Sequence, residues 1–256
     1  MNVGVIFVCP VVNWGRFEPL VKRFVSNYKQ LPPDYPHELH VICNGGEPTP
    51  EIKSLFSDLS PIYHTHDNSG WDIGAFQKFA PLVNCNPILF LGTNTHFRRA
   101  GWLRRLVEVY KEIGPGLLAT ATSNDICPHV RTNGFLCDPK LVTAATPNKI
   151  STLKDRHHFE VGPTSLYSTA RGQGLPCFLV TWDGVYPPER WREPVNIYRR
   201  GDQSNCLIYD RHHEIFEASS PEMKVRLGRI ADGNKFEYYR TAIQARLSNL
   251  FRSKKP

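Results

Sequence analysis

Short apolar runs alternate with amphipathic segments through the first part of the chain. The runs are rich in Val, Ile and Phe, as strands buried on both faces of a sheet are, whereas the other segments repeat apolar residues at helical spacing. The pattern predicts strands at 3–8, 38–43, 61–64 and 88–91, and helices at 17–28, 51–57 and 71–79. This alternation predicts a single-domain α/β fold, with a mainly parallel central sheet flanked by helices and ligands at the carboxyl ends of the strands.

Charge narrows the choice of partner only in part. The chain has 256 residues, of which 41% are hydrophobic, and a net charge of +7. A positive field favours nucleic acid, anionic lipid or a phosphorylated ligand. Because no signature of an RNA-binding or DNA-binding module occurs, we expect no nucleic-acid partner.

Cysteine usage and the start of the chain indicate a compartment. The seven cysteines are widely spaced and include no Cys-x-x-Cys pair, so they are expected to be reduced and mostly buried. The apolar start lacks a basic segment before it, and no apolar stretch reaches the ~18 residues that a spanning helix needs. A cytoplasmic protein, soluble or peripheral at the inner face of a membrane, is the expectation.

Polar and turn-forming residues follow the predicted strands, at the edge of the sheet where a ligand is expected. Carboxylates and amides there are suited to ribose hydroxyls and base N–H groups, although the acids and glycines are also good turn formers. Both interpretations stay open. The candidate nucleotide-binding or donor-binding residues are Pro10, Val11, Asn13, Asn44, Asp67, Asn68, Gly70, Asp72, Thr93, Asn94 and Thr95.

Four segments in this order resemble nucleotide-sugar glycosyltransferases of the GT-A fold. Segments 8–13 and 41–46 are similar to the first two strand ends of that fold, and segment 67–76, DNSGWDIGAF, is similar to the N-x-G-x-D-I-G-A segment of bacterial polysaccharide and rhamnan-type transferases. Segment 88–103 resembles the strand, the Asp-x-Asp tip and the helix after it. The resemblance implies a GT-A-like domain over 1–235, with a nucleotide-binding half (1–100) and an acceptor half (101–235).

The chain departs from this family at the tip itself. Thr93-Asn94-Thr95 stands where the family usually has Asp-x-Asp, so the carboxylates that hold a divalent cation against the diphosphate are missing. No metal ligand is assigned here, and a Mn²⁺ or Mg²⁺ cofactor is doubtful. One alternative is that cationic side chains neutralise the diphosphate instead, because Arg binds phosphate bidentately. The candidates are Arg98, Arg99 and Arg131, and by resemblance a late histidine, His213.

Two acids are candidates for catalysis. Glu160 lies in a segment that resembles the region after the acceptor loop, where an acid opens a helix, and an inverting enzyme needs a carboxylate to deprotonate the acceptor hydroxyl. Its alternative is helix capping. Asp202 resembles the acid of an Asp-Gln helix start, where it would contact sugar or acceptor or serve as the alternative base. It too has capping as an alternative.

The segment 236–256 predicts a basic amphipathic C-terminal helix. Such a helix would lie on an anionic membrane that presents a lipid-linked acceptor, or would pack against the domain.

Together these features predict a glycosyltransferase, a hexosyl- or deoxyhexosyltransferase, that moves a sugar from a nucleotide-diphosphate sugar to a saccharide or lipid-linked glycan. Polysaccharide or lipopolysaccharide assembly is implied by the resemblance only. Transfer with inversion of the anomeric configuration is preferred because a candidate base exists, and transfer with retention stays open. The main alternative is a non-catalytic nucleotide-sugar or glycan-binding protein. A phosphoryl-transfer enzyme is disfavoured because the chain has neither a P-loop nor a paired-carboxylate tip.

Overall fold

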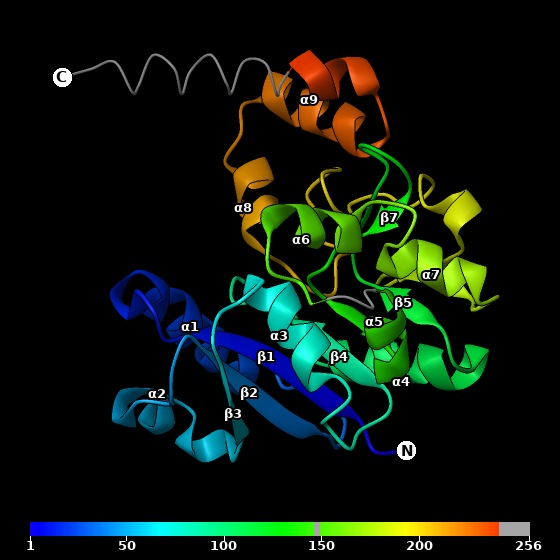
Figure 1. Ribbon diagram of the computed structural model, residues 1–256. Helices are drawn as coiled ribbons and strands as arrows, with labels where there is room; N and C mark the ends of the chain where they lie inside the picture. Colours follow the sequence, from blue (N-terminus) through cyan, green and yellow to red (C-terminus); the bar gives the residue numbers. More distant parts are fainter. Residues whose placement is uncertain (146–148, 241–256) are drawn as a thin grey trace.

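The computed structural model describes residues 1–145 and 149–240. Residues 235–240 are also helical. The elements, labelled as in Figure 1, are β1 (Gly4–Pro10), α1 (Trp14–Gln30), β2 (Glu38–Asn44), α2 (Pro50–Leu55), η1 (Ser57–Leu59), β3 (Ile62–His66), α3 (Trp71–Phe79), β4 (Ile88–Leu91), α4 (Trp102–Ile113), β5 (Leu117–Ala119), β6 (Thr122–Ser123), β7 (His129–Val130), β8 (Phe135–Cys137), α5 (Pro139–Ala145), α6 (Leu153–Glu160), α7 (Leu166–Gly172), β9 (Cys177–Val180), β10 (Val185–Tyr186), η2 (Pro188–Arg190), α8 (Arg211–Glu217) and α9 (Pro221–Ala231).

All seven elements predicted in the first part of the chain are present. The bounds of α3 and β4 agree with the prediction, and the other elements shift at one or both ends. The largest shift is at α1, which begins at Trp14 because Asn13 takes a left-handed conformation, with φ of 58°, and turns the chain directly out of β1. The apolar spacing that begins at Phe17 carries no signal for this early start.

The central sheet has the strand order β10-β9-β5-β8-β4-β1-β2-β3. The pairs β1–β2, β1–β4, β2–β3 and β5–β9 are parallel. By contrast, β8 runs antiparallel to both β4 and β5, and β10 runs antiparallel to β9. The predicted α/β class with a mainly parallel sheet is therefore confirmed. Its carboxyl edge lies at the ends of β1, β2 and β4.

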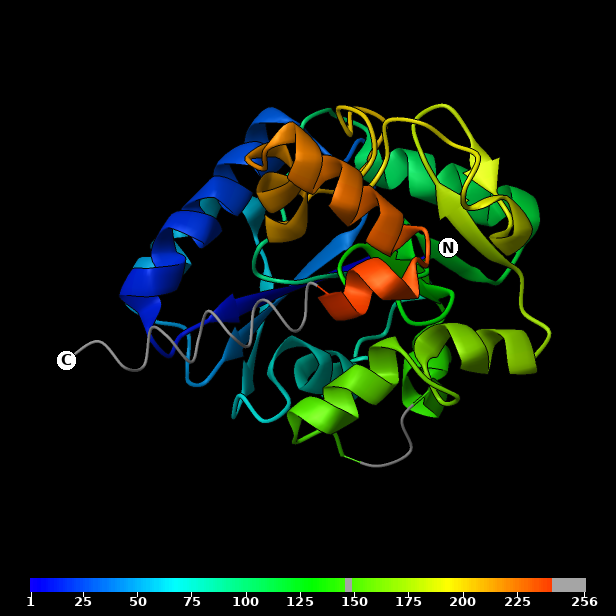
Figure 2. The ribbon, with the colours of Figure 1, turned by 90° about the horizontal axis from the view of Figure 1, so that it is seen from above.

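Two apolar layers cover the two faces of this sheet, because alternate residues of a strand point to opposite faces. Ile6 and Val8 of β1 pack in the layer that includes residues of α3, α5, α6 and α7. Phe7 packs in the other layer, with α1, α2 and α4, and its ring stacks on Phe24 at 3.7 Å between centroids. Figure 2 shows α1 and α4 on one side of the sheet and α3, α6 and α7 on the other.

The helices α8 and α9 lie at the top of the molecule in Figure 1, and the N-terminus lies at the bottom. The segment that leads into α8 is fixed to the chain after β4 by two backbone hydrogen bonds between His96 and Tyr209, each 3.0 Å long. This bridge places the beginning of α8 next to the carboxyl end of β4. Residues from late in the chain thereby reach the edge of the sheet.

The predicted C-terminal helix falls mainly outside the described residues, which end at 240. Within the described part, Phe236 and Tyr239 are exposed. No helix among the described residues combines the length and the apolar character needed to cross a bilayer. The domain boundary at 235 and the membrane contact stay predictions.

Candidate functional site

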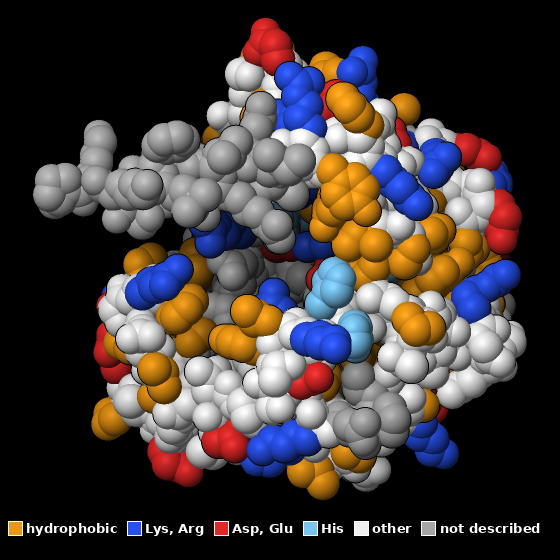
Figure 3. All heavy atoms as spheres, turned by 45° about the horizontal axis from the view of Figure 1, so that its top comes forward, with side chains coloured by type: hydrophobic (Ala, Val, Ile, Leu, Met, Phe, Trp, Pro, Cys, Tyr) orange, Lys and Arg blue, Asp and Glu red, His pale blue; other side chains and the backbone are white. Residues whose placement is uncertain are grey.

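Two adjoining cavities lie at the carboxyl edge of the sheet. The first has a volume of about 350 Å³ and the second of about 240 Å³. Four residues line both, so the two cavities share a wall: Asp72, Thr93, Asn94 and Arg156. Figure 3 shows a hollow in the upper side of the molecule, with Lys, Arg and His side chains around it.

The first cavity gathers most of the nucleotide-binding candidates of the sequence. Its lining includes Pro10, Asn13, Asn44, Asn68, Asp72, Thr93 and Asn94. They meet because β1, β2 and β4 are neighbours that end at the same edge: Val11 N donates to Asn44 O at 2.9 Å, and Thr93 Oγ1 donates to Val8 O at 2.9 Å. Adjacent parallel strands thus bring residues far apart in the sequence to one site.

The turn before α3 separates the two acids that the sequence placed together. Asp67 is exposed, and its Oδ1 accepts from the backbone N and the hydroxyl of Ser69, at 3.0 and 2.6 Å. These hydrogen bonds lower the pKa of Asp67 to about 2. The side chain lines a different cavity, which it shares with Lys149. Asp67 therefore acts as a turn former, while Asp72 reaches the shared wall of the first and second cavities.

Backbone strain marks the same turn. Asn68, Gly70 and Trp71 have φ of 68°, 70° and 55°, all left-handed, and Trp71 is a bulky residue for which this is a rare conformation. A Cβ at Gly70 would lie 2.3 Å from Ile150 O, so only glycine fits here. Asn68 and Trp71 line the first cavity. Gly70 shapes this wall without lining it.

The tip after β4 uses both of its hydroxyls to hold the backbone. The hydroxyl of Thr93 donates to Val8 O, as described above. The hydroxyl of Thr95 lies 2.7 Å from both Gly92 O and Asn133 Oδ1, and Thr95 is fully buried. Thr95 lines neither cavity. Asn94 is thus the tip residue whose side chain is not committed to these contacts, and it lines both cavities.

The second cavity holds a buried ion pair. Arg131, just after β7, places Nη1 2.8 Å from Oε1 of Glu160, and both side chains are less than one-fifth exposed. Glu160 is the last residue of α6, not the opening residue of a helix. The capping interpretation of Glu160 is therefore wrong, because a carboxylate at a helix C-terminus opposes the helix dipole.

Asp210 and His212 line the other wall of the second cavity, and the buried His213 lies behind them. Asp210 caps α8: its Oδ1 accepts from His212 N at 2.8 Å and lies 2.9 Å from His213 Nδ1. Burial would raise the pKa of Asp210, but the hydrogen bond from His213 and the charges of His213, His212 and Arg131 hold it well below its usual range. His212 lines the cavity, and burial together with Arg131 lowers its pKa to about 4.

No family model matches the sequence, and no curated protein matches it either. Among solved structures, residues 1–349 of TarS from S. aureus match with a TM-score of 0.51 at 11% identity, covering 94% of this chain and 73% of that one. The fold is GT-A-like. The chain covers only 32% of a longer TarS structure.

Two further solved structures with transferase names match more weakly. Mouse xyloside xylosyltransferase 1 in its apo form has a TM-score of 0.46 at 10% identity, covering 70% of this chain and 85% of that one. The mannosyltransferase PcManGT from Pyrobaculum calidifontis, in complex with GDP-Man and Mn²⁺, has a TM-score of 0.42 at 12% identity, covering 55% and 45%.

Several candidates lie away from both cavities of this GT-A-like fold. Asp202 is exposed and accepts from Ser204 in a turn, at 3.0 Å from its backbone N. No helix begins at Asp202, so the expected Asp-Gln helix start is wrong: the helix that follows is α8, which begins at Arg211. Val11 and the buried His213 also lie outside both linings. Of the two late histidines, His212 lines the second cavity.

The arginines near the tip also differ from expectation. Arg98 pairs with Glu217 at 2.6 Å and lies over the ring of Tyr209, and Arg99 lies over the ring of Trp182. Neither lines the two cavities, so of the three expected arginines only Arg131 lies at the site.

The arginine between the two cavities was missed by the sequence analysis. Arg156 lines both, and in the described part of the chain no carboxylate lies within 4.0 Å of it. A signal for it exists: Arg156 precedes Glu160 by one helical turn, so the two face the same side of α6.

The described residues offer one set of three His, Cys, Asp or Glu side chains close enough to bind an ion together, namely Glu38, His40 and Cys85. It lies at the opposite end of β2 from Asn44. Within the two cavities, the groups that could neutralise a phosphate are cationic: Arg16, Arg131, Arg156 and Arg211.

Proposed function

We propose that this protein is a glycosyltransferase that moves a sugar from a nucleotide-diphosphate sugar to a saccharide or lipid-linked acceptor. The observation that carries the proposal is the pair of adjoining cavities at the carboxyl edge of a GT-A-like sheet. Arg156 lies in their shared wall and the carboxylate of Glu160 lies in the second cavity. A donor needs two such compartments, one for its nucleoside and one for its sugar, with the diphosphate between them.

The first cavity fits the nucleoside. Asn13, Asn44 and Asn68 bring amide groups into it, which both donate and accept hydrogen bonds as ribose hydroxyls and base edges require. Trp71 and Phe17 add apolar surface for the base. Its volume of about 350 Å³ lies at the small end of the range for small-molecule sites.

The diphosphate would lie along the shared wall, where Arg156 supplies a planar cation suited to phosphate oxygens. Arg211 adds a second positive charge in the second cavity. Fixed cations aimed at the leaving group stabilise the charge that develops as the glycosidic bond to the donor breaks. Because both hydroxyls of the tip bind backbone or amide oxygens, this transfer would proceed without a divalent cation.

Glu160 would act as the base in an inverting reaction. It would accept the proton of the acceptor hydroxyl as that oxygen attacks the anomeric carbon from the face opposite the leaving diphosphate. Asp210 is the weaker candidate, because its depressed pKa makes it a poor base and its oxygen already caps α8. Arg131 holds the Glu160 carboxylate in place at 2.8 Å.

A thermal-shift screen of UDP-, GDP-, dTDP- and CDP-sugars, each with Mn²⁺ or EDTA, tests this proposal. A donor present at 100 times its Kd stabilises the folded state by about 2.7 kcal/mol. We expect one nucleotide class to raise the Tm, equally in EDTA and in Mn²⁺. A shift that vanishes in EDTA would refute metal independence, and no shift with any donor would refute donor binding.

A second candidate is a nucleotide-sugar-binding protein without turnover, which the inward-bound hydroxyls of Thr93 and Thr95 favour. It would give the same thermal shift. Incubation of the bound donor with a panel of saccharide and lipid-linked acceptors separates the two functions. Release of nucleoside diphosphate that depends on the acceptor establishes a transferase, and binding without release establishes the second candidate.

A further inference from the structure

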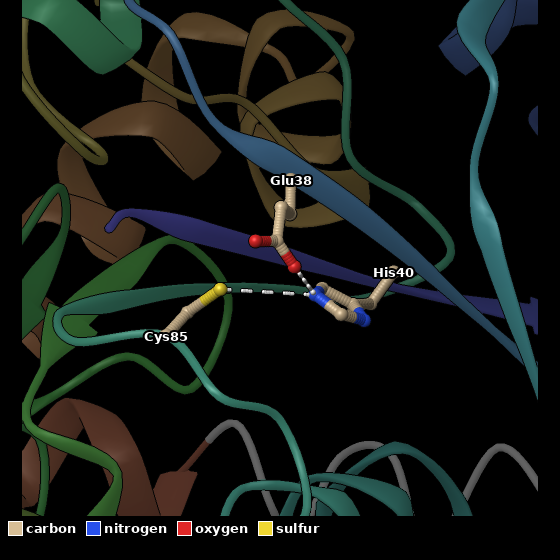
Figure 4. Close-up of side chains that lie close together, drawn as sticks. All are labelled: Glu38, His40 and Cys85. Carbon is tan, nitrogen blue, oxygen red and sulfur yellow. Dashed lines mark hydrogen bonds and ion pairs between the residues drawn. The ribbon is translucent and has the colours of Figure 1, made fainter.

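Three side chains with metal-binding groups lie close together (Figure 4). They lie at the amino end of the sheet, whereas the two cavities lie at its carboxyl edge. Glu38 and His40 extend from the beginning of β2, and Cys85 lies in the segment before β4. Their ligand atoms all lie within 4.8 Å of one another. Neither cavity includes any of them, so the proposed transfer reaction gives them no role.

We propose that Glu38, His40 and Cys85 bind a zinc ion. Sulfur, imidazole nitrogen and carboxylate oxygen are the three ligand types that zinc uses in proteins, whereas Mg²⁺ and Ca²⁺ prefer oxygen alone. With three protein ligands, the fourth tetrahedral position is left to water, and the side chain of Glu38, 41% exposed, keeps the site open to solvent.

The spacing of the ligand atoms suits this geometry. Tetrahedral zinc with usual bond lengths separates a nitrogen from an oxygen ligand by about 3.4 Å, and a nitrogen from a sulfur ligand by about 3.6 Å. Here His40 Nε2 lies 3.4 Å from Glu38 Oε2 and 3.8 Å from Cys85 Sγ. Binding therefore needs only a small rotation of the exposed Glu38 carboxylate toward the thiol.

Outer contacts already orient two of the ligands. Asn2 Nδ2 donates to Glu38 Oε1 at 2.8 Å, which leaves Oε2 directed at the histidine. His40 Nδ1 lies 3.0 Å from His64 Nε2, so a proton on Nδ1 leaves the lone pair of Nε2 directed at the proposed ion. A histidine ligand that hydrogen-bonds through its other nitrogen is the usual arrangement at zinc sites, because that bond fixes the tautomer and the ring.

Burial favours the neutral imidazole of His40 and the protonated thiol of Cys85 when no metal ion is bound. Both His40 and Cys85 are at most 4% exposed. Burial lowers the pKa of His40, so its imidazole is neutral at pH 7. Burial and the nearby Glu38 raise the pKa of Cys85 to about 12. Zinc would replace the thiol proton and release it to solvent.

The expected consequence is structural. An ion here would join the beginning of β2 to the segment that enters β4, at the end of the sheet opposite to the cavities. Because the ligands come from separate parts of the chain, the site exists only in the folded protein, and zinc binding adds to the free energy of unfolding.

The test uses tag-free protein that is stripped with a chelator, reloaded with Zn²⁺, desalted and analysed for metal content. We expect one zinc ion per chain and a higher Tm than in the stripped protein. Substitution with Co²⁺ should give a sulfur-to-cobalt charge-transfer band, which reports the thiolate directly. Cys85→Ser should abolish the band and weaken zinc affinity by at least about 100-fold.

Cys177→Ser is the matched control, since Cys177 is equally buried but lies on β9, and it should retain both the ion and the band. Glu38→Gln tests the site without a change in the core, because this side chain is exposed. It should weaken zinc binding while the Tm of the metal-free protein stays unchanged. Donor binding should not change in any of these variants. No retained zinc, or equal retention in Cys85→Ser and Cys177→Ser, would overturn the proposal.

Discussion

The two cavities differ in how the chain builds them. The first is lined mostly by residues at the ends of β1, β2, β3 and β4 or just after them, so their places follow from the sequence pattern. The second takes Arg131, Glu160 and Asp210 from three loops or helix ends in the later part of the chain. The ends of regular strands therefore form the proposed nucleoside compartment. Loops and helix ends form much of the compartment in which the transfer reaction is proposed. The difference predicts that variants of the second cavity change turnover, whereas variants of the first change affinity.

Glu160→Gln should produce the largest effect. Loss of a general base lowers the rate by about 10²- to 10⁴-fold, while donor affinity should be unchanged because the first cavity is untouched. The measurement is kcat with an acceptor that supports turnover in the panel proposed above, together with a donor Kd by calorimetry. Asp202→Asn, an exposed acid outside both cavities, is the control. Turnover within about threefold of the parent would remove Glu160 from the proposed mechanism.

Arg156→Ala should weaken donor binding by about 10- to 100-fold, the size expected when a charge-assisted hydrogen bond to phosphate is lost. Binding of the free nucleoside should be unchanged, because only the phosphates reach the shared wall. Arg98→Ala serves as the control, since that arginine is paired with Glu217 away from the cavities. Equal losses for the nucleoside and the diphosphate would show that Arg156 does not separate the two compartments.

Acid should destabilise the folded protein through His96, whose backbone is bridged to Tyr209 before α8. Burial and the charge of Arg23 lower the pKa of His96 to about 4 in the folded state. Since the folded pKa lies below the unfolded value of about 6.5, this contribution is complete above pH 6.5 and is lost as the pH falls toward 4. At pH 5 the loss is of order 2 kcal/mol. Urea unfolding between pH 5 and 7 should show it, and His96→Gln should flatten the profile; an unchanged slope would contradict the assignment.

Asp67→Ala should have the smallest effect, with donor affinity changed by less than about twofold, because surface substitutions away from a site are usually near neutral. Asp72→Ala, five residues further along the chain and in the shared wall of the two cavities, should reduce affinity clearly more. Burial raises the pKa of the Asp72 carboxyl, and the charge of Arg156 partly offsets this. If the two variants weakened binding equally, Asp67 would contact the nucleotide and would not be a turn former alone.

Much of the first half of the molecule follows from the sequence. The exact bounds of α3 and β4 were predicted because apolar periodicity is strong there and turn residues flank both elements. Asn13, Asn44 and Asn94 were placed at one site by a topological rule, since parallel strands present their ends together. The same rule does not say which of two nearby acids faces the ligand, and Asp67 shows this.

The contacts in the second half of the molecule could not be predicted from the sequence. The short strands β5 to β8 and the loops between them carry little periodicity, and the pairing of Arg131 with Glu160 joins residues from separate elements. The sequence also did not show which of the two histidines lines the cavity. Asp210 caps α8 and contacts His213, which is buried, while the neighbouring His212 lines the cavity. Adjacent residues face different ways on a helix, and only the cap decides which one is exposed.

The sequence by itself determined the alternation of strands and helices, the polar strand ends and the replacement of the acidic tip, because these are properties of local pattern and composition. Only the tertiary structure decided that Arg156 lies between two cavities, that Glu160 pairs with Arg131, and that Glu38, His40 and Cys85 meet at the amino end of the sheet. Each of these depends on contacts between residues distant in the chain. Such contacts arise from packing, and no local pattern in a single sequence encodes them.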